Sequence, residues 1–271
     1  MLDVAAIQKL LDPQALIGPV RSLSSVSSTN DIAWAWATAG CAEGAVYFAE
    51  EQVQGRGRFG RTWLCPRGAG LLMSVVLRPS DPAITPAHLT ALTALAASEA
   101  VEEVAGLQAV IQWPNDVMVA GRKLAGVLVE RRGGAGTACV AGVGMNVNVA
   151  PAEFPEAVRA IATSLSAAAG HTFVREEVAA ALLRRLDARY RQTGQGAWDQ
   201  VAAAWRQRGS LVGEDVEVEC AGATWHGTVV AVDPVAGIEL ELRGGERRAF
   251  VAERTTVLST SHHAAAEIAG G

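Results

Sequence analysis

The pattern of apolar residues in this 271-residue chain changes at Gly213, and the change divides the sequence into two parts of different architecture. Before Gly213, long apolar runs alternate with stretches whose apolar residues recur every three or four positions, which is typical of buried strands and amphipathic helices. After it come short alternating runs, at 216–220, 225–232, 238–242 and 248–251. Such runs, separated by turn residues, indicate a small antiparallel barrel. We therefore expect an α+β fold with a large unit at 1–209, a small β unit at 210–258 and a disordered tail at 259–271.

The large unit is predicted to be a mixed β-sheet with flanking helices. Strands are expected at 45–50, 71–77, 110–113 and 138–149, with a hairpin that joins 117–120 to 123–130 around Gly121. Helices are expected at 31–39, 86–106, 175–192 and 197–208. The helix at 86–106 would turn Glu99, Glu102 and Glu103 to solvent, and the helix at 175–192 would carry its arginines on an outer face. Residues 1–26 predict one short helix and an extended lead-in.

Composition limits the classes of function. The 28 acidic residues outnumber the 23 basic ones, so the net charge is −5. A general nucleic-acid binder is therefore not expected, because affinity for a phosphate backbone grows with the number of cations presented. The four cysteines form no CxxC pair, which favours reduced thiols. No secretory signal opens the chain and no apolar run is long enough to span a bilayer. We expect a cytoplasmic protein with neither nucleic acid nor membrane as a partner.

The segment Gly-Arg-Gly-Arg-Phe-Gly-Arg-Thr-Trp at 55–63, called the arginine loop below, combines three glycines with three arginines and has no acidic residue. Glycine lets backbone N–H groups approach a ligand closely, and arginine offers planar donors suited to phosphate and carboxylate. The loop therefore predicts an anion site. A competing interpretation is a non-catalytic RNA- or protein-binding arm.

Lys123 is the residue on which we expect the chemistry to depend. It stands between the turn at Gly121 and the apolar run 124–129, shortly after Trp-Pro-Asn-Asp at 113–116. This context suggests that the ammonium is held in a partly buried site, where one cation can bring two anions together.

Five sequence blocks together resemble the biotin protein ligases. They are Ser-Thr-Asn at 28–30, Gln52 with the arginine loop, Trp-Pro-Asn-Asp at 113–116, 121–130, and Gly-Val-Gly-Met-Asn at 142–146. The resemblance covers about residues 24–258. It implies a catalytic domain like those of class II aminoacyl-tRNA synthetases, followed by an SH3-like C-terminal domain. It fits the monofunctional type without a DNA-binding domain, because residues 1–26 are too few for a helix-turn-helix unit.

The resemblance also implies an activity and its residues. The family joins biotin to AMP with ATP and Mg²⁺, and then passes the biotinyl group to a lysine of the biotin carboxyl carrier domain of a carboxylase such as acetyl-CoA carboxylase. Biotin would contact Ser28, Thr29, Asn30, Gln52, Arg56, Gly57, Arg58, Lys123, Leu124, Gly126 and Gly142, the glycines making room for its ring and chain. ATP would contact Arg58, Arg61, Trp63, Asn115, Lys123 and Asn146. Lys123 and Arg58 would neutralise the charge that develops at the α-phosphorus.

Two features leave alternatives open. Asp116 caps the turn after Pro114, or it helps to deprotonate the incoming carrier lysine. Gln112 stands where many relatives have lysine, which removes one cation near the expected nucleotide site. The related lipoate–protein ligases are the nearest alternative in function, and the oligomeric state, a homodimer included, is left open. The glycine-rich loop is expected to order over the adenylate.

Overall fold

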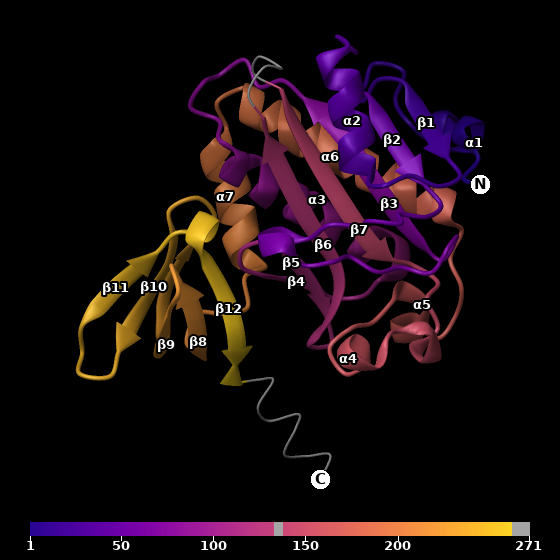
Figure 1. The fold of residues 1–271 in the computed structure, drawn as a ribbon. Helices are drawn as coiled ribbons and strands as arrows, with labels where there is room; N and C mark the ends of the chain where they lie inside the picture. Colours follow the sequence, from indigo (N-terminus) through magenta and orange to yellow (C-terminus); the bar gives the residue numbers. More distant parts are fainter. Residues whose placement is uncertain (133–137, 262–271) are drawn as a thin grey trace.

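The computed structural model describes residues 1–132 and 138–261, which form two β-sheets with helices around the larger one (Figure 1). The larger sheet has the spatial order β1 (Val20–Leu23), β2 (Val46–Ala49), β3 (Gly70–Leu77), β7 (Cys139–Asn146), β6 (Arg122–Arg131), β5 (Asp116–Val119), β4 (Ala109–Gln112). The smaller sheet has the order β11 (Arg247–Phe250), β10 (Gly237–Leu242), β9 (Ala223–Asp233), β8 (Asp215–Cys220), β12 (Thr255–Thr260). The expectation of a mixed sheet followed by a separate antiparallel sheet is confirmed.

The larger sheet is mixed because β1 and β2 run parallel, whereas each remaining neighbouring pair is antiparallel. All eight residues of β3 are buried, as its apolar sequence predicts for a central strand covered on both faces. The hairpin of β5 and β6 is irregular, since its register shifts between Val117 and Met118. This irregularity lies beside Lys123 and affects which side chains reach the pocket described below.

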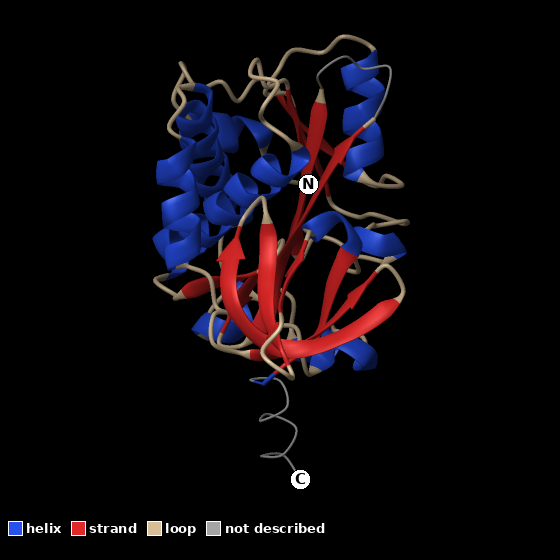
Figure 2. Cartoon of the chain, turned by 90° about the vertical axis from the view of Figure 1, so that its left-hand side faces the viewer, coloured by secondary structure: helices blue, strands red, loops and turns tan. Residues whose placement is uncertain are grey.

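Helices lie on both sides of the larger sheet (Figure 2). One side is covered by α3 (Pro86–Ala105), α6 (Arg175–Gly194) and α7 (Trp198–Gln207), with the short α1 (Val4–Lys9) beside α6. The opposite side is covered in part by α2 (Thr29–Thr38). The short helices α4 (Glu156–Arg159) and α5 (Leu165–Ala169) follow β7, and α5 contacts α3. Alternation along β2 shows the two faces, since Val46 and Phe48 join the main core whereas Tyr47 packs with Trp34 of α2.

A continuous apolar core joins the two sheets. The main cluster of buried side chains includes Leu95 and Trp205 from the helices and also Val218, Leu240 and Phe250 from the smaller sheet. A backbone hydrogen bond from Ile111 to Arg208 (2.7 Å) ties β4 to the segment that enters the smaller sheet. The smaller sheet is therefore fixed against the larger one by apolar packing as well as by the chain.

The prediction that Glu99, Glu102 and Glu103 of α3 face solvent is wrong for Glu99. Glu99 is only 8% exposed and binds Arg189 of α6 through two hydrogen bonds, and Glu103 pairs with Arg184 and Arg185. Arg184, Arg185 and Arg189 of α6 thus pair with carboxylates of α3, whereas Arg191 pairs with Asp187 of its own helix. Polar residues at helical spacing mark a face, but a complementary neighbouring helix can cover that face with charge pairs.

The sequence did not predict β12, which pairs with β8 and completes the smaller sheet. Its last residues, Ser259 and Thr260, are in a strand, although the disordered tail was expected to begin at Ser259. The rest of that expected tail from 262 on, with His262 and His263, lies outside the described residues. None of the helices in the described part of the chain is long and apolar enough to cross a membrane.

Candidate active site

The arginine loop folds into a compact turn rather than an extended arm. Its ends are joined by hydrogen bonds from Gly57 N to Arg61 O (2.6 Å) and from Trp63 N to Gly55 O (3.0 Å). Gly55 is required by close packing, because a Cβ there would lie 2.3 Å from the carbonyl oxygen of Trp63. Phe59 at the tip adopts a left-handed conformation with φ of 53°. The loop thereby presents its arginines in fixed directions.

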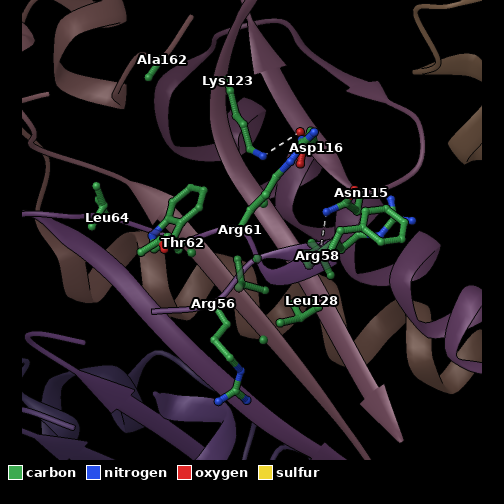
Figure 3. Close-up of a pocket in the computed structure, with 18 of the residues that line it drawn as sticks. Arg56, Arg58, Arg61, Thr62, Leu64, Asn115, Asp116, Lys123, Leu128 and Ala162 are labelled. Carbon is green, nitrogen blue, oxygen red and sulfur yellow. Dashed lines mark hydrogen bonds and ion pairs between the residues drawn. The ribbon is translucent and has the colours of Figure 1, made fainter. Parts of the chain in front are cut away.

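The loop closes over a cavity of about 290 Å³ on the sheet face opposite α3 (Figure 3). Every site residue predicted from the sequence lines this cavity except Leu124; those lining it are Ser28, Thr29, Asn30, Gln52, Arg56, Gly57, Arg58, Arg61, Trp63, Asn115, Asp116, Lys123, Gly126, Gly142 and Asn146. Segments separated by more than 100 residues in the sequence thus meet in one pocket.

Leu124 was expected in the biotin site, and this is wrong. Its side chain is fully buried in the main core on the other side of the sheet. Lys123, the residue before it, is turned toward the cavity and has its backbone held by hydrogen bonds with the segment 161–163: from Lys123 N to Ile161 O (2.7 Å) and from Thr163 N to Lys123 O (2.9 Å). Successive residues of a strand point to opposite faces, so only one of these two could reach the pocket.

The side of β6 and β7 that faces the cavity carries glycines, and side chains from other elements occupy the space that these glycines leave open. Gly126 and Gly144 lie opposite each other across the two strands. A Cβ at Gly144 would lie 2.4 Å from the Trp63 indole, and one at Gly142 would lie 2.3 Å from Asn30 Oδ1. The space beside Gly142 is therefore filled by Asn30 and the space beside Gly144 by Trp63, whereas Gly126 and Gly142, the two glycines expected in the biotin site, both line the cavity.

Polar groups at the N-terminus of α2 form one end of the cavity. Gln52 Oε1 accepts hydrogen bonds from Thr29 N (2.7 Å) and Thr29 Oγ1 (3.0 Å), while Ser28, Thr29 and Asn30 are each only 3% exposed. Asn30 Nδ2 donates to Glu130 Oε2 (2.8 Å) and to Leu128 O (3.3 Å). These bonds fix donors and acceptors in a small volume, which suits a neutral polar ligand.

Lys123 and Asp116 form an ion pair at the other end (Figure 3). Lys123 Nζ lies 2.7 Å from Asp116 Oδ2 and 5.7 Å from the centre of the Trp63 ring, and its side chain is 33% exposed. The Oδ1 atom of Asp116 is buried and makes no hydrogen bond among the described residues. Asp116 is a strand residue paired with a lysine, so the alternative in which it caps the turn is wrong.

Arg58 reaches the smaller sheet. Its guanidinium donates to Asn115 Oδ1 (3.2 Å), to Thr255 O (3.4 Å) and to Ala252 O. Burial lowers the pKa of Arg58, an effect that the carboxylates of Asp116 and Glu253 oppose. The arginine thus connects the loop, the Asn115 turn and the C-terminal sheet.

The structure adds lining residues that the sequence did not predict. They come from the region after β7 and from the smaller sheet, and include Phe154, Val158, Ile161, Ala162, Thr256 and Val257. Arg61 also lines the cavity, and the described residues provide no hydrogen bond or ion pair for its side chain. It is therefore a cation free to meet a ligand.

Asn146 supplies an unused acceptor. Its Nδ2 donates to Thr163 O (3.0 Å), whereas its Oδ1 is buried without a hydrogen-bond partner among the described residues. The bond to Thr163 fixes the orientation of the amide, so the free atom is an acceptor. A buried acceptor of this kind favours a ligand that offers an N–H group.

Comparisons with known proteins agree with this geometry. Residues 22–148 match the model of the Biotin/lipoate A/B protein ligase family. The chain is 33% identical to the Bifunctional ligase/repressor BirA of Bacillus subtilis over 84% of this chain and 71% of that protein. It is 35% identical to the Biotin--[acetyl-CoA-carboxylase] ligase of Paracoccus denitrificans over 83% of this chain and 95% of that protein.

A solved structure resembles the fold over most of the chain. The biotin protein ligase from Aquifex aeolicus, in complex with biotin and ATP, superposes with a TM-score of 0.77 at 26% identity, covering 88% of this chain and 97% of that one. The chain therefore belongs to the biotin/lipoate A/B protein ligase family, and within it to the biotin protein ligases.

Proposed function

We propose that this chain activates biotin with ATP to form biotinyl-5'-AMP and pyrophosphate, and then transfers the biotinyl group to a lysine of a biotin carboxyl carrier domain, such as that of acetyl-CoA carboxylase. The single observation that carries the proposal is that one cavity joins a neutral polar end at Thr29 and Gln52 to a cationic end at Lys123 and Arg61. Biotin has the matching character, with a neutral ureido ring at one end and a carboxylate at the other.

The ureido ring would lie at the α2 end. Gln52 Oε1 is already engaged by Thr29, which leaves the amide nitrogen of Gln52 as a donor for the ureido oxygen. Ser28, Asn30, Gly57 and the backbone of Arg56 and Arg58 complete this end. The side chain of Arg56 pairs with Asp31 and Glu130, which supports a contact with biotin through the backbone of Arg56 rather than through its guanidinium.

In the first step the biotin carboxylate attacks the α-phosphorus of ATP, and pyrophosphate leaves. Both reactants are anionic, so Lys123 and Arg58 would hold them together and stabilise the charge on the phosphoryl oxygens. Fixed donors aimed at developing charge are among the largest contributions to catalysis, and removing one costs about 10²–10³ in rate. Arg61, Trp63, Asn115 and Asn146 would position the nucleotide, with the free Oδ1 of Asn146 accepting from the amino group of adenine.

Mg²⁺ would arrive with the triphosphate. No group of three or more His, Cys, Asp or Glu side chains gathers as a metal site among residues 1–132 and 138–261, and Asp116 is the one described carboxylate that lines the cavity. This donor set fits an ion held mainly by phosphate oxygens and water, as Mg²⁺ commonly is. Bound there, the ion would neutralise part of the charge on the leaving pyrophosphate.

In the second step the amine of the carrier lysine attacks the acyl carbon, an amide bond forms and AMP leaves. Asp116 would accept the amine proton, since its Oδ1 is free and its Oδ2 is held by Lys123. We further propose that the smaller sheet is an SH3-like domain, that the catalytic domain has the class II synthetase-like architecture, and that the protein works in the cytoplasm.

The test is ATP-dependent labelling of a purified biotin carrier domain, with pyrophosphate release and transfer from preformed adenylate measured separately. Lys123→Ala should abolish pyrophosphate release, whereas Asp116→Asn should slow transfer more than adenylation. Lys9→Ala is the matched control, because Lys9 is exposed and is the only other lysine of the sequence. Equal loss of both steps in Asp116→Asn would remove the base role, and labelling with lipoate in preference to biotin would replace the proposed substrate.

A further inference from the structure

Four side chains at the α2 end of the cavity form a closed ring of alternating charge, called the charge ring here: Asp31, Arg56, Glu130 and Arg132. Arg56 lies 2.7 Å from Asp31 Oδ2 and 3.0 Å from Glu130 Oε2. Arg132 closes the ring, since its Nη2 lies 3.2 Å from Asp31 Oδ1 and 3.2 Å from Glu130 Oε1. Each carboxylate therefore binds both guanidinium groups, and each guanidinium binds both carboxylates.

The ring connects three separate parts of the cavity wall. Asp31 belongs to the first turn of α2, Arg56 to the arginine loop, and Glu130 to the end of β6. Glu130 also accepts the amide of Asn30, so the ring is in direct contact with a residue that lines the cavity. Lys123 lies toward the opposite end from Arg56 (Figure 3), and its ion pair among the described residues is with Asp116, outside the ring.

Electrostatics favour the ring as one unit. Hydrogen bonding from Arg56 lowers the pKa of Asp31, and the bond to Asp31 raises the pKa of Arg56. The side chains are 24–44% exposed, so each pair taken singly contributes little, but a closed network holds its members in place together. The residue it holds in the loop, Arg56, directly precedes Gly57 and Arg58.

We infer that Asp31 and Arg132 are positioning residues for the biotin subsite, which act by holding Arg56 and thereby ordering the first half of the arginine loop before biotin arrives. The inference rests on the proposed function. Ordering a free glycine-rich segment costs about 1–2 kcal/mol per residue. A loop that is already tied down by the charge ring loses less conformational freedom on binding, and this preorganisation raises affinity without any contact between Asp31 and biotin.

The inference predicts different effects on the binding of biotin and of ATP. The second half of the loop is held independently by the bonds of Arg58 to Asn115 and to the smaller sheet. Breaking the charge ring should therefore weaken biotin binding and leave the nucleotide end in place. A residue that merely stabilised the whole fold would change both substrates and the unfolding temperature together.

The experiment compares wild type with Asp31→Asn, Arg132→Gln and the double variant. In each single variant we expect the KM for biotin to rise about three- to tenfold, with the KM for ATP and kcat within about twofold of wild type. The double variant should be no more than about twofold worse than either single variant, because one substitution already opens the ring. Limited trypsin digestion should cut the loop after Arg56 faster in the variants, at unchanged Tm, because Arg56 is the loop residue that the charge ring holds.

Glu241→Gln is the matched control, since it removes an exposed carboxylate that pairs with Arg247 in the smaller sheet. An unchanged KM for biotin in Asp31→Asn, or equal rises in both KM values with a lower Tm, would overturn the inference. Direct calorimetric titration with biotin separates this outcome from failure of the proposed function. If the wild-type protein bound no biotin, the proposed function would be wrong. If wild type and Asp31→Asn bound biotin with equal affinity, the proposed function would stand and only the positioning role of Asp31 would be wrong.

Discussion

At the scale of single residues, Gly144 controls the position of an aromatic ring in the cavity. A Cβ at this position would lie 2.4 Å from the Trp63 indole, which cannot give way without moving toward the cavity. Forcing an extra methyl group into a packed site costs about 1–3 kcal/mol. We expect Gly144→Ala to lower Tm by several degrees and to raise the KM for ATP, because Trp63 is a proposed nucleotide contact. Thermal unfolding and steady-state kinetics measure the two effects.

Gly194→Ala provides the comparison for that substitution. Gly194 is the last residue of α6, and a Cβ there would meet nothing within 4 Å. Replacing glycine by alanine in a helix stabilises by roughly 0.5–1 kcal/mol when the space is open. The two glycines should therefore respond in opposite directions, and a Gly144→Ala protein with wild-type Tm and nucleotide kinetics would contradict the packing argument.

At the scale of elements, the N-terminus of α3 should make stability depend on pH. His88 Nδ1 accepts a hydrogen bond from Thr85 N (3.2 Å), and the ring packs on Trp198. Burial lowers the pKa of His88 below 6.5, against the attraction of Asp233 and Asp81. The unfolded chain then binds a proton more readily than the folded one, so this contribution is complete above about pH 6.5 and is lost as pH falls through the lowered pKa.

Comparing Tm at pH 7.5 and pH 5.5 measures this contribution. We expect the drop in Tm to be smaller in His88→Gln than in wild type, because the substituted chain has no imidazole to protonate at this cap. His226→Gln, at an exposed position of β9, should keep the drop of wild type. Identical drops for wild type and His88→Gln would show that protonation of this histidine does not affect the cap.

Most strands of the larger sheet and its main helices could be predicted because each carries a local signal, such as the continuous apolar run of β3 and the three- and four-residue spacing of apolar side chains in α3. Contacts between distant segments could not. Glu99 looks solvent-facing until Arg189 of α6 is brought against it. Arg58 binds the backbone carbonyls of Ala252 and Thr255. Every residue has a backbone carbonyl, so the sequence does not show which ones accept a hydrogen bond. The motifs named residues that all line one cavity except Leu124, because adjacency in sequence does not say which face of an irregular strand a side chain takes.

At the scale of the whole molecule, the continuous core predicts that both sheets unfold together. Val218 of β8 is fully buried in the cluster that also contains the core of the larger sheet, so Val218→Ala removes packing that both share. The expected loss is about 1–3 kcal/mol, seen as one calorimetric transition at lower Tm. Val212→Ala, at a position 66% exposed, should leave Tm within about a degree of wild type, because surface substitutions seldom change stability by more than about 0.5 kcal/mol.

Val218→Ala should also affect the active site. Thr256 and Val257 of the smaller sheet line the cavity, and Arg58 binds the backbone just before them, at Ala252 and Thr255. Loosening that sheet should therefore raise the KM for ATP in Val218→Ala at temperatures well below its Tm, whereas Val212→Ala should not change it. Two separate unfolding transitions, with only the lower one shifted and nucleotide kinetics unchanged, would show instead that the smaller sheet folds independently and does not support the site.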